Sequence, residues 1–238
     1  MPFTKILTLS QTIGSLNIIA HPVIVFDDSE LVLCDAGYPG QVEQINSELN
    51  KNGFSVDDIT KIVITHHDHD HRGSLSELRE RNRNLIVISS EIEAPYIEGQ
   101  KKSLRLIQAE ELNKTLTGDE LQFGIQFADY IKTIQDSKVD QTVKDGDYII
   151  PGLRVISTPG HTPGHISLFC EDDHTLITGD ALAAENGVLV IANPQFTLDP
   201  ETSVESIRKI RDLAPQRIIC YHGGIVEGDI QAMLNDQI

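Results

Sequence analysis

The sequence contains few of the residues that often hold a small protein together. Its 238 residues include no tryptophan, only three cysteines and 5% aromatic residues. Cys34, Cys170 and Cys220 are odd in number and far apart, and none belongs to a CxxC pair. The sequence therefore predicts neither a disulfide framework nor a thiolate zinc site, and we expect the three cysteines to be small core side chains.

Positive charge is also scarce. Lysine and arginine number 19 against 36 aspartates and glutamates, which gives a formal net charge of −17. Nucleic acid and anionic membrane surfaces are negative too and would repel such a chain, so we expect neither as a partner. We expect a small-molecule substrate instead, and a monomer or a homodimer.

Long apolar runs are missing as well. The most apolar early stretch, residues 16–26, is interrupted by Asn17, His21 and Pro22 and is too short to span a bilayer. The beginning of the chain shows neither the compact apolar region nor the small-residue cleavage site of a secretory signal. We therefore expect a cytoplasmic protein.

What the sequence does contain is an alternation of strand-like and helix-like segments. Short β-rich runs bounded by turn residues predict strands, the first of them in an antiparallel meander. A helix is predicted at residues 41–50, and Ser74 with Glu77 matches a capping box at the start of another. Asp199 followed by Pro200 predicts the start of a third helix, and residues 229–234 a short last one. The predicted strands are residues 5–9, 18–26, 31–34, 61–65, 85–88, 153–156, 166–170, 176–178 and 217–220.

Residues 91–140 interrupt this alternation with helical stretches such as 104–116. No Pro/Gly/Ser-rich linker flanks them, so we expect one layered α/β domain over residues 1–238 with a helical insertion that covers the active site. The insertion carries a basic cluster of Lys101, Lys102 and Arg105. This cluster could bind an anionic substrate group, but we expect a solvated helix face.

The nine histidines of the chain are unevenly distributed. Four lie in residues 66–71, between a predicted buried strand and a predicted helix, and two lie in residues 158–165. Imidazole and carboxylate groups are the ligands of zinc, iron and manganese, and a loop at a strand end can aim several of them inward.

Four separate motifs carry a resemblance to a known family. They are His66-His67-Asp68-His69-Asp70-His71, Pro159-Gly160-His161-Thr162-Pro163-Gly164-His165, Thr178-Gly179-Asp180 and Tyr221-His222-Gly223. In this order they resemble the signature of the metallo-β-lactamase superfamily of binuclear metallohydrolases. The resemblance implies an αββα sandwich, with two β-sheets between helical layers and the metals at the sheet edges.

The resemblance also implies a ligand set for two divalent metal ions, zinc in the first place, with iron or manganese as alternatives. One ion would take His66, Asp68 and His161. The other would take Asp70, His71 and His222, with Asp180 bridging the two. The usual signature has histidine where this chain has Asp68, which makes the site one charge unit less positive. A competing register with His67 and His69 as ligands stays open.

Several neighbouring residues have roles that the sequence assigns less directly. Asp35 resembles the carboxylate that orients a ligand histidine in this family, or is an ordinary turn residue. His165 is expected to be structural, and His67 and His69 to be exposed or to support ligands. Tyr221 is expected to point away from the site.

The function implied is hydrolysis by a hydroxide shared between two metal ions, with Asp70 positioning it or carrying its proton. Small esters, lactones and thioesters are the leading substrates. An iron-dependent oxidoreductase of the same superfamily and a phosphodiester hydrolase are the alternatives, the former because an oxygen ligand at Asp68 suits iron.

Overall fold

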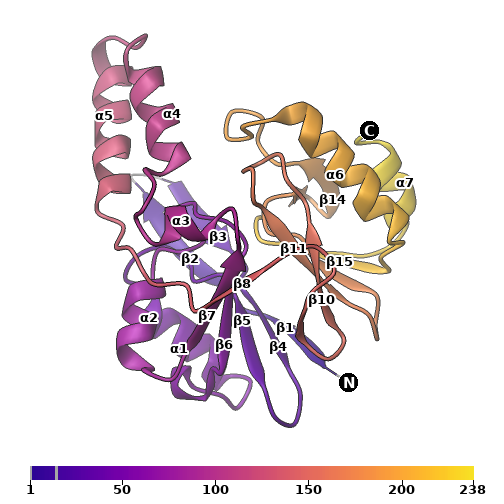
Figure 1. Cartoon of the computed structure of the whole chain (residues 1–238). Coiled ribbons are helices and arrows are strands. Elements are labelled where there is room, and N and C mark those ends of the chain that lie inside the picture. The colour runs from indigo at the N-terminus through magenta and orange to yellow at the C-terminus, as the bar shows by residue number, and fades with distance from the viewer. Residues whose placement is uncertain (1, 14–15) are drawn as a thin grey trace.

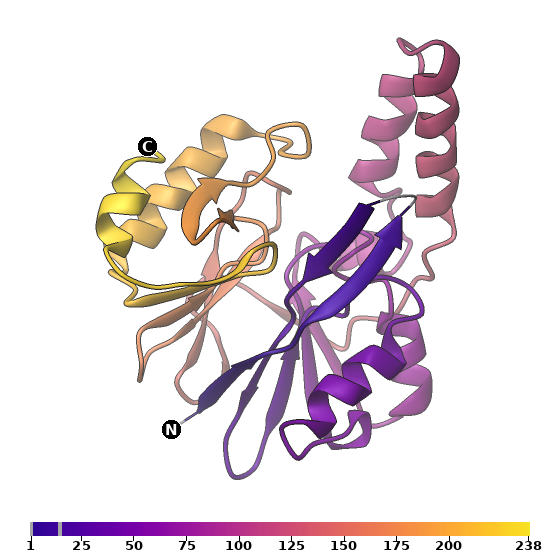
Figure 2. The ribbon, with the colours of Figure 1, turned by 180° about the vertical axis from the view of Figure 1, so that it is seen from behind.

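The computed structural model describes residues 2–13 and 16–238 and consists of four layers, with two six-stranded sheets between helices (Figures 1 and 2). The first sheet has the order β1 (Phe3–Ile6), β4 (Val23–Phe26), β5 (Leu31–Cys34), β6 (Lys61–Ile64), β7 (Ile86–Ser90) and β8 (Gln141–Val143). The second has the order β16 (Gly224–Val226), β15 (Arg217–Cys220), β12 (Thr175–Ile177), β11 (Ile166–Cys170), β10 (Leu153–Ser157) and β9 (Tyr148–Ile150). The αββα sandwich expected from the sequence is confirmed.

The strands are buried on both faces because each sheet lies between two layers. In β6, Ile62 and Ile64 belong to the apolar cluster under the helices, while Val63 belongs to the cluster between the sheets. In β15, Ile219 faces the space between the sheets and Ile218 faces the helices on the far side. The period-two alternation of side chains thus explains why these runs are apolar throughout.

Amphipathic helices cover the outer face of each sheet. The first sheet carries α1 (Val42–Asn50) and α2 (Leu75–Arg81), and the second carries α6 (Pro200–Asp212) and α7 (Ile230–Asn235). A 3₁₀ turn, η1 (Val56–Asp58), precedes β6. The predicted start of α6 is confirmed, since the Asp199 side chain accepts a hydrogen bond from the Thr202 backbone N–H at 3.0 Å and Pro200 occupies the first turn.

Between β7 and β8 lie α3 (Ala94–Ile97), α4 (Leu104–Asn113) and α5 (Gly118–Lys132). Figure 1 shows α4 and α5 as an antiparallel hairpin that rises from the sandwich. A small apolar cluster of Leu106, Ala109, Ala128 and Ile131 holds this hairpin together. Two further two-stranded pairs, β2 (Leu9–Ile13) with β3 (Leu16–Ala20) and β13 (Leu182–Glu185) with β14 (Val188–Ile191), lie outside the main sheets.

Four local predictions are wrong. The expected strand 5–9 is interrupted at residues 7–8, and its ends belong to β1 and β2 in different sheets. The expected strand 18–26 is interrupted by His21 and Pro22, because proline cannot donate a ladder hydrogen bond, and its two parts also join different sheets. Ser74 and Glu77 do not form a capping box. Instead the Ser74 hydroxyl donates to the Tyr38 carbonyl at 2.5 Å and Glu77 accepts from the Gly40 N–H at 3.0 Å, which ties the preceding loop to α2. The expected helix 104–116 ends at Asn113, where the chain turns into α5.

Within residues 2–13 and 16–238, no helix is long and apolar enough to cross a membrane.

Candidate metal centre

The candidate ligands lie in loops at the ends of strands. Strands β5 and β6 of the first sheet are parallel, as are β12 and β15 of the second. Because parallel strands place their carboxyl ends at one edge of a sheet, the loops after these strands meet where the two sheets face each other. These loops, with the one between β10 and β11, carry all seven candidate ligands: His66, Asp68, Asp70, His71, His161, Asp180 and His222.

The first group of potential ligands consists of His66, Asp68 and His161. Asp68 Oδ2 lies 3.2 Å from His161 Nε2 and 3.6 Å from His66 Nε2. All three residues are buried. One carboxylate and two imidazoles thus converge from both halves of the chain.

The second group consists of Asp70, His71 and His222. Asp70 Oδ2 lies 3.2 Å from His222 Nε2 and 3.9 Å from His71 Nε2. Its donor set is the same as that of the first group. His222 is the most exposed of the three residues, with 32% of its side chain accessible.

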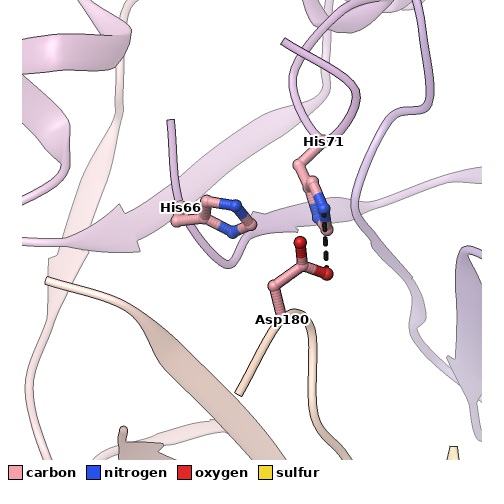
Figure 3. A group of neighbouring side chains, drawn as sticks. All are labelled: His66, His71 and Asp180. Atoms are coloured by element: carbon pink, nitrogen blue, oxygen red, sulfur yellow. Dashed lines mark ion pairs between the residues drawn. The ribbon is translucent and has the colours of Figure 1, made fainter. Parts of the chain in front are cut away.

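The Asp180 carboxylate lies between the two groups. One of its oxygens is 3.3 Å from His71 Nε2, and the other is 3.6 Å from His161 Nε2 and 3.7 Å from His222 Nε2. Figure 3 shows the His66 and His71 rings turned toward this carboxylate. Asp180 is therefore placed to contact ions at both positions.

Several atoms of these residues are buried and lack a hydrogen-bond partner among the described residues. They are His66 Nε2, Asp68 Oδ1, His71 Nε2 and Asp180 Oδ1, the last two forming an ion pair with each other at 3.3 Å. Unpaired buried polar atoms are costly, and their concentration at one point indicates that something else satisfies them. In His66 the hydrogen bonds also define the tautomer. The Thr65 hydroxyl donates to Asp35 at 2.9 Å and therefore accepts from His66 Nδ1 at 3.1 Å, which leaves Nε2 with a free lone pair.

The three carboxylates of the centre are held in their ionised form. Burial opposes ionisation of Asp68, but the Arg105 guanidinium and then His161 keep the pKa of its carboxyl well below the usual value. For Asp180, the neighbouring His71 and His222 outweigh burial and also place its pKa well below the usual value. For Asp70, His69 and His71 do the same.

The pKa values of the histidines shift in both directions. Burial lowers the pKa of His71, but Asp180, Asp35 and Asp70 together raise it well above its usual value. The pKa of His222 is raised too, by Asp180 and then Asp70 against the effect of burial. Burial, followed by repulsion from His71, lowers the pKa of His66.

Two residues outside the candidate ligand set hold these side chains in place. Asp35 Oδ2 accepts a hydrogen bond from His71 Nδ1 at 2.9 Å, so the first of its two expected roles is the one observed. His165 Nε2 accepts from the Asp180 backbone N–H at 3.0 Å, which agrees with a structural histidine. The preceding Gly179 has a φ of +52°, and a side chain there would lie 2.8 Å from His165 Nε2.

Neither His67 nor His69 belongs to a group of potential metal ligands among the described residues. His67 is buried rather than exposed, pairs with the Glu93 carboxylate and stacks on Tyr96 with 4.6 Å between ring centroids. His69 lies edge-on to the rings of Tyr130 and two other aromatic residues, with its Nδ1 3.7 Å from Asp70 Oδ1. The geometry thus favours the register with His66 and Asp68.

The expectation for Tyr221 is wrong. Its hydroxyl donates to the Asp70 backbone carbonyl, and its ring centroid lies 3.9 Å from that of His71. Strand β15 ends at Cys220, so the alternation that would have turned Tyr221 away no longer applies.

The expectation of a solvated face is wrong for Arg105. This arginine, in the first turn of α4, is only 2% exposed, and its Nη2 donates to Asp68 Oδ2 at 2.6 Å. Lys102, by contrast, is exposed and pairs with Glu110 on the surface. Sequence reasoning also missed the buried Glu93, whose Oε1 accepts from the Thr162 hydroxyl and the Gly164 N–H, both at 2.8 Å. Glu93 thereby joins the two histidine-bearing loops.

The residues present fit divalent metal ions. Each group offers two imidazole nitrogens and a carboxylate, and Asp180 adds an oxygen to both. This nitrogen and oxygen donor set is one that zinc, iron and manganese accept. The cysteines contribute nothing, since all three are buried and free, in agreement with the sequence.

Comparison with known proteins places this arrangement in a family. Residues 19–222 match the family model described as the metallo-beta-lactamase superfamily. A probable metallo-hydrolase of Bacillus subtilis is 31% identical over 208 residues, which are 81% of this chain and 75% of the relative. An N-acyl homoserine lactonase of Bacillus thuringiensis is 26% identical over 191 residues, which are 78% of this chain and 63% of the relative.

Solved structures agree with the fold. A metallo-beta-lactamase family protein of Thermus thermophilus superposes with a TM-score of 0.75 at 19% identity, covering 98% of this chain and 77% of that one. An archaeal protein of this superfamily from Sulfolobus tokodaii has a TM-score of 0.66 at 21% identity, covering 98% of this chain and 83% of that one.

Proposed function

Since the chain belongs to the metallo-beta-lactamase superfamily of metal-dependent hydrolases, we propose that it is a binuclear hydrolase that cleaves a small ester, lactone or thioester. The observation that carries this proposal is the pair of matched groups, each of two imidazoles and one carboxylate, with Asp180 between them. The seven residues would hold two divalent cations, with zinc as our first assignment.

When bound there, divalent cations supply Lewis acidity, which lowers the pKa of a water and polarises the oxygen of a substrate carbonyl. The protein contributes fixed positions. Asp35 and His165 hold His71 and Asp180 through the hydrogen bonds described above, so the donor atoms need not reorganise when the reaction proceeds.

We assign Asp70 the role of orienting the attacking water and holding its proton. Its Oδ2 faces His222 and His71, while its Oδ1 is directed toward His69 Nδ1 at 3.7 Å. Its carboxyl is ionised, so it accepts rather than donates a hydrogen bond. The Tyr221 hydroxyl donates a hydrogen bond to the Asp70 backbone carbonyl and so helps to hold Asp70 in position.

The insertion places two aromatic rings against His69, whose Nδ1 lies 3.7 Å from Asp70 Oδ1. Phe127 and Tyr130 of α5 lie edge-on to His69, with ring centroids 5.4 Å and 5.7 Å away, and Tyr38 approaches His69 at 5.7 Å. Partly apolar rings at this position suit the acyl part of a small ester or lactone. They support our proposal that the insertion covers the active site.

The substrate class has two further supports. The lactonase of Bacillus thuringiensis matches 78% of this chain, and we propose a lactone or a related ester for this chain on that basis. The net charge of −17 disfavours a polyanionic substrate such as nucleic acid.

The proposal is tested with purified protein whose metal content is measured, assayed against a panel of lactones, aryl esters, thioesters and a phosphodiester. We expect two divalent ions per chain and turnover of at least one carbonyl substrate. Asp180→Ala should lose metal from both positions and reduce kcat/KM by at least about 100-fold. Glu185→Gln, an exposed carboxylate outside the site, is the control and should change neither.

Other outcomes would contradict the proposal. Full metal content in Asp180→Ala would show that Asp180 is not shared. Turnover of the phosphodiester alone would favour the phosphodiester hydrolase. Iron as the bound metal together with consumption of oxygen would favour the oxidoreductase that the carboxylate at position 68 also allows.

A further inference from the structure

The two candidate metal positions have the same donor set, which makes any difference between their surroundings informative. Each has one aspartate and two histidines, and Asp180 lies beside both. Among the described residues, the ion pairs of Asp70 and Asp180 are all with histidines. Asp68, in contrast, is also paired with an arginine.

That arginine is Arg105, and it reaches into the first group. Its Nη2 lies 2.6 Å from Asp68 Oδ2 and 3.3 Å from His161 Nε2, and its Nε lies 3.1 Å from the same Asp68 oxygen. These are two of the three residues that would hold the first cation. A guanidinium keeps its proton throughout the ordinary pH range, so this positive charge is permanent.

Several further contacts hold the Arg105 guanidinium in this position. Its Nη2 also donates to the Phe196 carbonyl at 2.7 Å, its Nη1 bonds Gln108, and the group lies 5.0 Å from the centre of the Phe196 ring. The backbone N–H of Leu104 donates to His67 Nε2 at 3.2 Å, which anchors the start of α4 next to the ligand loop. Arg105 is therefore built into the site.

We propose that Arg105 is a resident counter-cation of the first metal position. The insertion brings Arg105 to Asp68, and its positive charge weakens divalent-cation binding there relative to the second position. The inference rests on the proposed metal centre. Asp68 adds a negative charge where the family signature has a neutral histidine, and Arg105 offsets that charge. It also occupies Asp68 Oδ2, the oxygen that faces His66 and His161, and leaves Asp68 Oδ1 without a hydrogen-bond partner among the described residues.

The consequence is an order of filling. The second position, with Asp70, His71 and His222, has no lysine or arginine paired with its carboxylates in the described part of the chain. Protons on His71 and His222 can leave when an ion binds, whereas Arg105 keeps its charge, so we expect the second position to bind first. At the first position the entering ion meets the repulsion of a fixed positive charge in a buried setting, where such repulsion is weakly screened. The protein thus passes through a state with a single ion.

The test measures zinc affinity by competition with a chromophoric chelator in two single-site backgrounds of the full chain. His222→Ala leaves the first position, and His161→Ala leaves the second. Adding Arg105→Gln should tighten zinc binding about 10- to 100-fold in the first background and by less than about 3-fold in the second. Arg105→Lys, which keeps the charge, should stay close to its parent.

The matched control is Lys102→Gln, which removes one positive charge from the same segment but at an exposed position. It should change zinc affinity by less than about 3-fold in both backgrounds, because solvent and salt screen it. If Arg105→Gln leaves first-position affinity unchanged or weaker, Arg105 only fastens the insertion and the inference is wrong.

Two further results keep the test decisive. If Arg105→Gln does not fold, as judged by circular dichroism, the zinc affinities of His222→Ala and His161→Ala, both with Arg105 intact, are compared with each other. The first position should then be weaker by about 10-fold or more, and equal affinities would overturn the inference. If neither background binds zinc, iron or manganese, the proposed metal centre itself fails, which is distinct from a centre that binds metal without responding to Arg105.

Discussion

At the scale of single residues, the Asp68–Arg105 pair determines the net charge of the candidate metal centre. The sequence alone predicts a site one unit less positive than one with histidine at position 68. The guanidinium 2.6 Å from Asp68 Oδ2 restores that unit. A carboxylate with its own buried arginine therefore resembles a neutral histidine in net charge, although not in its donor atom.

Asp35 gives the first prediction at this scale. It accepts from His71 Nδ1, and both the N–H and the hydroxyl of Thr65 donate to it. Asp35→Asn should tolerate the backbone φ of 65° and keep the fold, but it replaces a charged acceptor of His71 with a neutral one. We expect zinc affinity at the second position to fall about 10- to 100-fold, measured by chelator competition.

Asp57→Asn, an exposed substitution in η1, is the matched control for Asp35→Asn and should leave zinc affinity unchanged. Unchanged affinity in Asp35→Asn as well would mean that Asp35 is an ordinary turn residue.

His71 gives a prediction about pH. In the metal-free protein its pKa is raised well above the usual 6.5, and that of His222 is raised too. A group whose pKa rises on folding stabilises the fold fully below its unfolded value and loses that contribution as pH climbs through the folded value. Between pH 6.5 and 8.5 we therefore expect the free energy of unfolding of the metal-free protein to decrease, measured by urea unfolding.

The histidines with lowered pKa act at the low end of this window or below it. Burial lowers the pKa values of His21, His66 and His165, so each changes protonation below pH 6.5 in the folded protein and near pH 6.5 in the unfolded chain. His71→Gln should flatten the decrease. A rising profile in the unsubstituted protein, or an equally steep one in His71→Gln, would contradict the assignment.

At the scale of elements, the candidate centre is formed by loops after parallel strands together with the loop between the antiparallel strands β10 and β11, while the insertion adds side chains from one side. Helix α4 contributes Arg105 at its first turn and α5 contributes Phe127 and Tyr130 near its last. The outer part of the α4–α5 hairpin projects from the sandwich (Figures 1 and 2). The contacts described above between the hairpin and the site therefore come from its base.

This arrangement predicts that the base sets substrate preference. Replacing residues 107–131 with a short Gly/Ser linker removes Phe127 and Tyr130 but keeps Arg105 and all candidate ligands. We expect relative kcat/KM for long and short acyl esters to change by about 10-fold, with metal content intact. Removing only residues 112–124 should change it much less. Identical selectivity in both variants would show that the insertion does not line the site.

At the scale of the whole molecule, the centre joins the two halves of the sandwich. The first half contributes His66, Asp68, Asp70 and His71. The second half contributes His161, Asp180 and His222. Cations bound between them would link sheets that otherwise meet through an apolar layer that includes Val63 and Leu168. Binding to the folded state alone stabilises it by mass action.

We therefore expect zinc to raise the melting temperature, with about 2.7 kcal/mol of stabilisation per site at a free concentration about 100 times Kd. A chelator should reverse the shift, and Asp180→Asn should lose most of it. Scanning calorimetry checks this expectation. A shift of equal size in Asp180→Asn would mean that zinc stabilises the protein elsewhere.

Some features of this protein follow from the sequence alone, because they depend on neighbours along the chain. Buried strands such as β6 and β11 can be recognised as apolar runs, and Asp199 with Pro200 marks the start of α6. The candidate ligands came from the resemblance of four short motifs to the metallo-β-lactamase superfamily. The same resemblance placed Asp68 where histidine is usual.

Only the tertiary structure decided which distant groups meet these residues. Arg105 lies 37 positions after Asp68, and nothing in its local pattern distinguishes it from the exposed Lys102. His67 is buried because Glu93 and Tyr96 pack on it. The Ser74 hydroxyl donates to the Tyr38 carbonyl in a neighbouring loop instead of capping its own helix. The partners of these polar groups are set by how the insertion and loops pack, because a buried charge or hydroxyl takes whichever partner the fold brings within reach.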